Sequence, residues 1–168
     1  MKKKKKGLAI GNSDFKEIIQ ENGYYVDKTK FIEDLLEDLS KVKLFTRPRR
    51  FGKTLNLSML KYFFDVRNAE ENRKLFDNLY ISKSEYMENQ GQNPVILISL
   101  RNAEAENWED SFFNIKNLIS SLYDNFEYIS SNLKKRDLVE FENIWFKKDN
   151  ADWENSLKNL SRYLYEYY

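Results

Sequence analysis

Apolar residues in this chain recur mainly at helical spacing, and two short segments rich in apolar residues interrupt that pattern. Intervals of three and four residues predict helices around 15–20, over 27–39, from 53 to about 66, and over 108–126, 137–146 and 153–168. The two segments are 42–45, which includes Lys43, and the continuous apolar run 94–100, and both are predicted strands. The second run has one polar position, Ser99, which suits a parallel strand buried on both faces. Residues 67–93 are predicted to form short helices and loops.

Two central strands with crossover helices predict an α/β fold, a three-layer α/β/α domain with parallel central strands and a helix-rich second half. Ligands of such sheets bind at the carboxyl ends of the strands, where the turn after 42–45 and the segment 99–102 would lie. The aromatic residues of the later helices are expected to be packing residues, namely Trp108, Phe112, Phe113, Trp145 and Trp153.

The turn after the first predicted strand has the layout of a phosphate-binding loop. It ends in Gly52, Lys53 and Thr54, at the start of a predicted helix. A P-loop needs a glycine where the backbone approaches phosphate, a lysine that reaches the β- and γ-phosphates, and a hydroxyl that ligates Mg²⁺. The first glycine of the usual P-loop pattern is absent, because Arg47 stands at its position.

The rest of the turn is cationic and holds Pro48, Arg49, Arg50 and Phe51. Arginine pairs well with phosphate oxygens, so Arg47, Arg49 and Arg50 are expected to neutralise phosphate charge. The alternative is that they bind surface carboxylates, of which the chain has many. A plain basic turn between a strand and a helix also remains open.

Composition narrows the chemistry further. The chain has 168 residues, with 28 Lys and Arg against 27 Asp and Glu, so a basic field over the whole domain is excluded. It has no cysteine and no histidine, which excludes disulfides, the usual zinc sites and histidine acid–base catalysis. Without an apolar run long enough to span a membrane, a cytoplasmic location is expected. Residues 1–7, rich in lysine, are expected to be a disordered tail.

A P-loop enzyme also needs a second apolar strand that ends in an acidic residue, to hold Mg²⁺ and position water. The run 94–100 continues into Arg101, and no carboxylate follows before Glu104. Phe64 is followed by Asp65, but that pair belongs to the helix after the turn. The acidic strand is therefore expected to lie outside this sequence, which reads as the front part of a longer domain.

Several segments in order resemble the bacterial AAA-ATPase-like family, whose members often carry a PD-(D/E)xK nuclease-like domain after the ATPase domain. They are Ile-Gly-Asn-Ser-Asp-Phe at 10–15, Tyr-Tyr-Val-Asp-Lys-Thr at 24–29, and Thr-Arg-Pro-Arg-Arg-Phe-Gly-Lys-Thr at 46–54. The resemblance implies that 8–168 is the N-terminal part of such a domain. It makes the absent first glycine a family trait and adds Asp27 and Lys28 to the nucleotide-site residues.

The resemblance implies ATP and Mg²⁺ as cofactors, with Lys53 stabilising the transferred phosphoryl group and Thr54 on the metal. We expect nucleotide binding with little hydrolysis by this chain alone. A truncated regulatory module, paired with a protein partner or a second copy through an incomplete sheet edge, is one alternative. A nucleic-acid contact through the arginine-rich turn is another, and a downstream nuclease-like domain would also imply nucleic acid.

Overall fold

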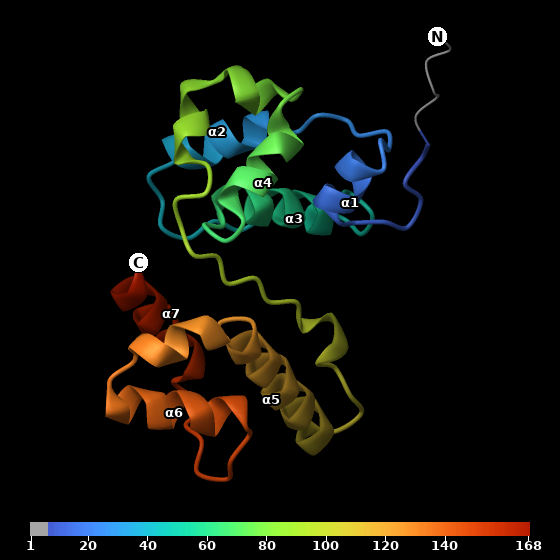
Figure 1. The fold of residues 1–168 in the computed structure, drawn as a ribbon. Coiled ribbons are helices and arrows are strands. Elements are labelled where there is room, and N and C mark those ends of the chain that lie inside the picture. Colours follow the sequence, from blue (N-terminus) through green and yellow to red (C-terminus); the bar gives the residue numbers. More distant parts are fainter. Residues whose placement is uncertain (1–6) are drawn as a thin grey trace. The chain divides into compact units, whose positions relative to one another are not determined.

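The structure is a computed structural model that describes residues 7–168, and the chain divides into two compact units, Met1–Val95 and Ile96–Tyr168 (Figure 1). The lysines predicted to form a tail fall at positions 2–6, outside the described residues. The structure is 57% helical, with 2% strand and no sheet over the part that it describes. Each unit is therefore a set of packed helices.

The first unit is built from short helices around one long helix, α3. In chain order its elements are α1 (Phe15–Gln20), α2 (Lys30–Glu37), α3 (Lys53–Phe64), α4 (Ala69–Arg73) and the 3-10 helices η1 (Lys74–Phe76), η2 (Tyr80–Lys83) and η3 (Glu85–Asn89). Helical periodicity predicted α1, α2 and α3, and the short helices of 67–93 are also confirmed. The core consists of tilted and edge-on aromatic rings together with aliphatic and thioether side chains, and its fully buried members are Phe15, Ile32, Met59, Phe63, Phe76 and Ile81.

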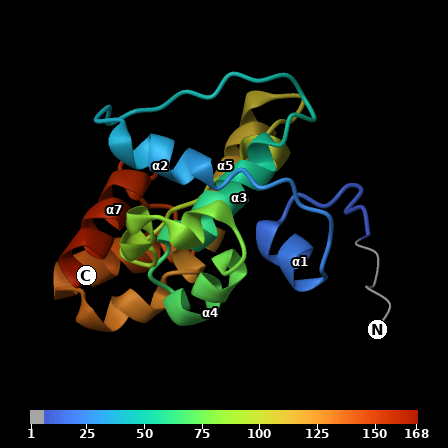
Figure 2. The ribbon, with the colours of Figure 1, turned by 90° about the horizontal axis from the view of Figure 1, so that it is seen from above.

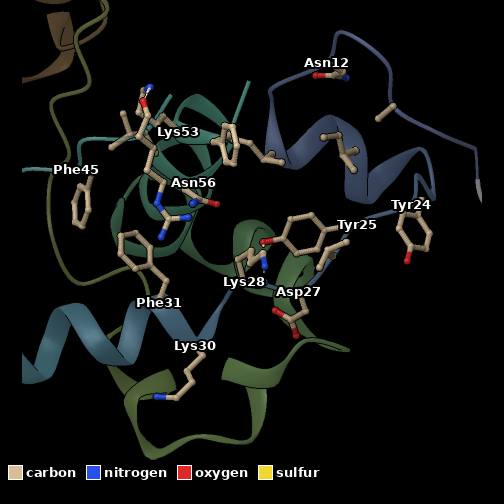
Figure 3. Close-up of a pocket in the computed structure, with 18 of the residues that line it drawn as sticks. Asn12, Tyr24, Tyr25, Asp27, Lys28, Lys30, Phe31, Phe45, Lys53 and Asn56 are labelled. Atoms are coloured by element: carbon tan, nitrogen blue, oxygen red, sulfur yellow. Dashed lines mark hydrogen bonds between the residues drawn. The ribbon is translucent and has the colours of Figure 1, made fainter. Parts of the chain in front are cut away.

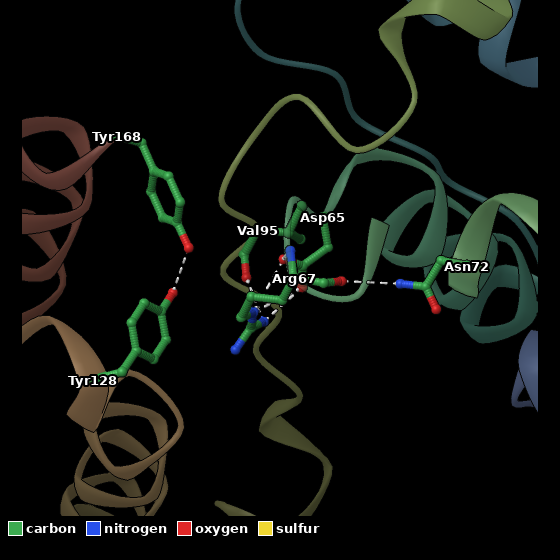
Figure 4. Close-up of polar contacts among 6 residues, drawn as sticks. All are labelled: Asp65, Arg67, Asn72, Val95, Tyr128 and Tyr168. Atoms are coloured by element: carbon green, nitrogen blue, oxygen red, sulfur yellow. Dashed lines mark hydrogen bonds and ion pairs between the residues drawn. The ribbon is translucent and has the colours of Figure 1, made fainter. Parts of the chain in front are cut away.

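The two ends of α3 are held differently. Asp65 follows the last residue of α3 and is buried, with its carboxylate 2.6 Å from the Arg67 guanidinium. Arg67 also donates a 3.4 Å hydrogen bond to the Val95 carbonyl, and Asn72 donates to the Arg67 carbonyl (Figure 4). Asp65 therefore fixes the C-terminal end of α3, as expected for a carboxylate that does not face the cationic turn.

The second unit packs three longer helices, α5 (Trp108–Asp124), α6 (Lys135–Trp145) and α7 (Ser156–Tyr167), with the 3-10 helices η4 (Leu100–Asn102) and η5 (Glu127–Asn132). Asn107 caps α5 by accepting a 2.8 Å hydrogen bond from the Asp110 amide. In the core, the Tyr123 hydroxyl donates to the Ser156 carbonyl at 2.6 Å, and burial raises the Tyr123 pKa. Near the chain end, the Tyr128 and Tyr168 hydroxyls lie 2.9 Å apart (Figure 4).

The predicted α/β/α layering is wrong, because neither predicted strand has a neighbour to pair with. Residues 42–45 lie in the long connection from α2 to α3, which Figure 2 shows as an extended coil. Val42 and Leu44 lie on one face of this segment and are 86% and 85% exposed, so no layer covers that face. Residues 94–99 are also extended without a ladder. Over residues 7–168 only two isolated parallel bridges occur, Gly7 with Gly23 and Asp65 with Asn93.

Two of the expected packing residues are also placed differently. Trp108 and Phe113, near the start of α5, are 69% and 60% exposed. Trp108 instead stacks on Phe112, with ring centroids 5.4 Å apart. Trp145 and Trp153 pack against the core of the second unit, as predicted. Helical periodicity correctly predicts that Trp108 lies in a helix. It does not predict whether another element covers the first turn of that helix.

Within the described chain, no helix combines the length and apolar character that crossing a bilayer requires.

Gly91 gives a test of the packing beside α3. Its φ is +70°, its amide donates a 2.8 Å hydrogen bond to the Phe63 carbonyl, and a Cβ added there would lie 2.4 Å from the Ala69 Cβ. Gly11 has a similar φ of +81°, but its Cβ position is open. Left-handed backbone costs either alanine variant about 1–2 kcal/mol, and overpacking adds about 1–3 kcal/mol at Gly91 alone. Urea denaturation should therefore show Gly91→Ala clearly less stable than Gly11→Ala, and equal stabilities would contradict the packing.

Candidate functional site

The cationic turn leads into α3 through two residues in the left-handed region. Arg50 has φ +69°, and Gly52, the N-cap of α3, has φ +72°. A glycine adopts this conformation freely, whereas an arginine is strained there. Gly52 therefore supplies a left-handed residue directly ahead of α3 without strain. Arg50 adopts the same conformation at a cost in backbone strain.

Lys53 closes the turn on itself. Its ammonium group donates hydrogen bonds to the Arg47 carbonyl and, at 3.1 Å, to the Pro48 carbonyl. Both contacts are with backbone oxygens of the same turn, so the ammonium lies beside the segment that a phosphate would approach. No carboxylate of the described chain forms an ion pair with Lys53.

The N-terminus of α3 is open to an anion. Gly52 has no side chain to cap it, and the first turn of α3 contains no acidic residue. The Gly52 carbonyl accepts from the Asn56 amide at 2.9 Å, which is the first backbone bond of the helix. The amides ahead of Asn56 and the helix dipole both favour negative charge at this end.

The three arginines of the turn have no acidic partners. Within residues 7–168, Arg47, Arg49 and Arg50 form no ion pair or side-chain hydrogen bond with a carboxylate. The alternative in which they bind surface carboxylates thus receives no support from the structure. Their charge remains available for an external anion.

The turn borders a pocket of about 900 Å³ in the first unit (Figure 3). This volume lies in the range of roughly 300–1,000 Å³ that is usual for small-molecule sites. Of the predicted site residues, the pocket is lined by Asp27, Lys28, Arg47, Phe51, Gly52 and Lys53. Pro48, Arg49, Arg50 and Thr54 do not line it. The pocket thus meets the turn along one side, and Thr54 lies exposed just beyond it.

Both carboxylates that line the pocket are already engaged. The Asp34 side chain pairs with Lys30 at 2.8 Å, and this contact raises the Lys30 pKa. The Asp27 carboxylate accepts from the Thr29 amide at 2.8 Å and from the Tyr80 amide at 2.6 Å. Neither carboxylate is therefore free to act as a general base toward a water molecule.

Asp27 and Thr29 have a clear structural role. The Thr29 hydroxyl donates to Asp27 at 2.7 Å and accepts from the Ile81 amide at 3.1 Å. Thr29 is the N-cap residue of α2. The Asp27 carboxylate bonds the amides of Thr29 and Tyr80 and does not bond those of the first turn of α2. These bonds fix η2 against the start of α2, and Asp27 borders the pocket as well.

The earlier motif attaches α1 to α3. Asp14 caps α1 by accepting from the Glu17 amide at 3.0 Å, and its second oxygen accepts from the hydroxyls of Ser58 at 3.3 Å and Tyr62 at 3.0 Å. The Phe15 amide donates to the Ser58 hydroxyl at 3.0 Å. Partial burial, with the bond to Asp14, raises the Tyr62 pKa to about 12. Both upstream motifs therefore position α3 and its surroundings.

Sequence reasoning missed part of the pocket. Asn56 lines it, and so do residues 8–10 and the side chains of Phe31 and Phe45, whose rings meet edge-on at 5.0 Å. Asn56 could have been found, because a residue three positions after Lys53 lies on the same helix face. The segment 8–10 carries no such signal, since its approach to α3 depends on tertiary packing. The predicted segment 99–102 belongs to the second unit and does not line this pocket.

Residues 9–168 match the AAA-ATPase-like family, described as predicted AAA-ATPase, and the chain belongs to that family. The match includes both upstream motifs, the cationic turn and all helices of the two units. Comparisons with curated proteins and with solved structures give no match.

The Asp27–Thr29 arrangement can be tested by a pair of isosteric changes. Thr29 is fully buried, so Thr29→Val leaves the Ile81 amide without its acceptor and should cost about 1–3 kcal/mol of unfolding free energy. Thr54→Val is the matched control, because the Thr54 hydroxyl is exposed and has no hydrogen bond within the described residues. Urea denaturation followed by circular dichroism measures both. A loss of the same size for the two variants would argue against the buried role of Thr29.

Because the backbone of Arg50 is strained, glycine substitutions at positions 50 and 49 should change the stability of the protein in different directions. Arg50→Gly relieves a left-handed conformation that costs about 1–2 kcal/mol, and this exceeds the unfolded-state entropy of glycine, about 0.5–1 kcal/mol. Arg49 is outside the left-handed region, so Arg49→Gly carries only the entropic loss. Thermal unfolding should show Arg50→Gly as stable as the parent or more so, and Arg49→Gly less stable. The reverse order would show that Arg50 is unstrained.

Proposed function

We propose that this chain binds ATP through a P-loop formed by residues 47–54, as the ATP-binding part of an AAA-like ATPase. The observation that carries the proposal is the N-terminus of α3, which is uncapped and free of acidic residues, with Lys53 beside it. Family membership supports it, because the family is described as predicted AAA-ATPase. A cytoplasmic location is part of the same proposal.

The charges around the turn suit a triphosphate. Arg47 and Lys53 line the pocket, and Arg49 and Arg50 flank it without carboxylate partners in the described chain. A phosphate at the helix N-terminus would accept from the backbone amides and from the Lys53 ammonium. For this, Lys53 exchanges its bonds to the Arg47 and Pro48 carbonyls for charge-assisted bonds to phosphate oxygens, which are the stronger kind.

Magnesium fits this site only together with the nucleotide. Over residues 7–168 no group of three or more acidic side chains could hold a metal ion. Mg²⁺ keeps several waters and commonly binds through substrate phosphates and one or two protein oxygens. The exposed Thr54 hydroxyl, next to Lys53, is the protein oxygen that we assign to it. The bound ion would neutralise phosphate charge at the end of the nucleotide nearest Lys53.

We expect binding with little turnover by this chain alone. Hydrolysis requires a group that positions the attacking water. The pocket carboxylates, Asp27 and Asp34, are held by backbone amides and by Lys30. Lys53 would stabilise charge on the transferred phosphoryl group, but the described pocket contains no free carboxylate to act as its partner.

Titration of Mg–ATP against the parent chain and Lys53→Ala tests the proposal. Loss of a charge-assisted bond costs about 1.5–3 kcal/mol, so the Kd should rise by about ten- to hundredfold in isothermal calorimetry. Lys61→Ala is the matched control, because Lys61 lies in the last turn of the same helix and does not line the pocket. It should leave the Kd unchanged.

The other functions predict different results in the same experiment. A module that acts only through protein contacts predicts no ATP binding by the parent chain. A nucleic-acid contact through the arginines predicts oligonucleotide binding that weakens steeply with salt and is unaffected by ATP. Either result would overturn the proposal.

A further inference from the structure

The pocket extends well beyond the turn that would hold phosphates. Arg47, Gly52 and Lys53 border one part of it, and the rest is bounded by the segments 8–10 and 24–26 together with the first turns of α2 and α3. In Figure 3, Tyr24 lies on the opposite side of the pocket from Phe45, with Tyr25 between them. A triphosphate alone would leave this second part empty.

We call the surface formed by Leu8, Ala9, Ile10, Tyr24 and Val26 the N-terminal wall. Its residues are apolar or aromatic, yet they face solvent: Ile10 is 90% exposed, Tyr24 58% and Val26 55%. Grouped apolar side chains that face solvent inside a pocket usually mark a surface that a ligand covers.

Three other aromatic rings that line the pocket, those of Tyr25, Phe31 and Phe45, pack against other side chains of the protein. Tyr25 meets Phe15 edge-on at 5.3 Å, and its hydroxyl lies 3.3 Å from the Met59 sulfur. Burial raises the Tyr25 pKa to about 12. Phe31 and Phe45 pack on each other. The Tyr24 ring has no ring partner or hydrogen bond within residues 7–168, so its face is available for stacking.

Resting on the proposed function, we infer that the N-terminal wall is the seat of the nucleobase, with a purine stacked against Tyr24 and Val26. Because the pocket is continuous, a nucleotide whose phosphates lie at Lys53 can extend its base toward this wall. The face of a purine covers more apolar surface than that of a pyrimidine, so purines should bind more tightly. Asn56 also lines the pocket, and its side-chain amide has no hydrogen-bond partner in the described chain, so this amide is available to the middle of a bound nucleotide.

The contacts of the motif at 24–29 would hold the wall in place. Asp27 and Thr29 hold the start of α2 and η2 together, as shown above. Their bonds fix the backbone just after Val26. The segment 24–26 is therefore positioned by buried polar contacts, while its own side chains stay free to contact a ligand.

Two probes separate the wall from the phosphate turn. Mg–ATP contacts both, whereas Mg–tripolyphosphate lacks base and ribose and contacts only the turn. Tyr24→Ala should raise the Kd for Mg–ATP by about five- to 150-fold, the loss expected for one stacked base, and leave the Kd for Mg–tripolyphosphate unchanged. Tyr24→Phe keeps the ring and should bind like the parent chain. Tyr165→Ala is the matched surface control, because Tyr165 is 86% exposed in the second unit.

Val26→Asp provides an independent variant, since it puts a negative charge on the wall without disturbing a buried group. It should weaken Mg–ATP more than Mg–tripolyphosphate. Circular dichroism checks that each variant keeps its helix content.

The outcomes distinguish the two proposals. If both probes bind and Tyr24→Ala and Val26→Asp leave the ATP-to-tripolyphosphate ratio of Kd values unchanged, the base seat is overturned and the phosphate turn stands. If Lys53→Ala weakens both probes and the wall variants weaken ATP more than tripolyphosphate, both proposals are supported. If the parent chain binds neither probe, the proposed function fails, and the base seat fails with it.

Discussion

Burial of one face of α3 is the constraint on which the first unit depends. Met59 and Phe63 on that face are fully buried in the aromatic core, so the helix cannot rotate or slide without opening a cavity. Ser58 and Tyr62, on an adjacent stripe, bond Asp14 and so fix α1 on the same helix. With its body held in this way, α3 presents Lys53 and the uncapped amides at a defined place beside the pocket.

The turn ahead of α3 combines two demands that conflict. A phosphate loop needs backbone freedom, which glycine supplies, and positive charge, which arginine supplies. Here Gly52 meets the first demand and Arg50 adopts the same left-handed conformation at a cost. The result is a turn with three arginines and one glycine. Of the three arginines, Arg47 lines the pocket, and the backbone of the turn is stabilised by the Lys53 ammonium, which bonds the Pro48 carbonyl.

The sequence predicted the local features of this structure well. Helix periodicity depends on neighbouring residues alone, and it placed α1, the start of α3 and the three helices of the second unit. The strands failed because a strand exists only with a partner, and the partner is set by the whole fold. The apolar run 42–45 satisfies every local rule for a strand, but Val42 and Leu44 meet solvent instead of a neighbouring layer.

The candidate site shows the same division. Gly52 and Lys53 could be recognised because the motif is contiguous and its chemistry is fixed by spacing. Arg50 could not be recognised as left-handed, because its φ depends on how the turn is closed by Lys53. The N-terminal wall was invisible for another reason. Its residues come from two segments that lie beside the turn only because α1 is attached to α3. The sequence of 8–10 has no periodicity that would predict this placement.

The two parts of the pocket would contribute to affinity in physically different ways. Contacts between exposed arginines and phosphates are screened by salt, and Lys53 must first give up its bond to the Pro48 carbonyl. Contacts with Tyr24 and Val26 bury apolar surface, and that contribution is nearly independent of salt. A ligand that uses both parts should therefore bind with a weaker salt dependence than one held by charge alone. A nucleotide fits that description, whereas a nucleic-acid backbone on the arginine-rich turn does not, and the apolar wall is thus the feature that favours the nucleotide.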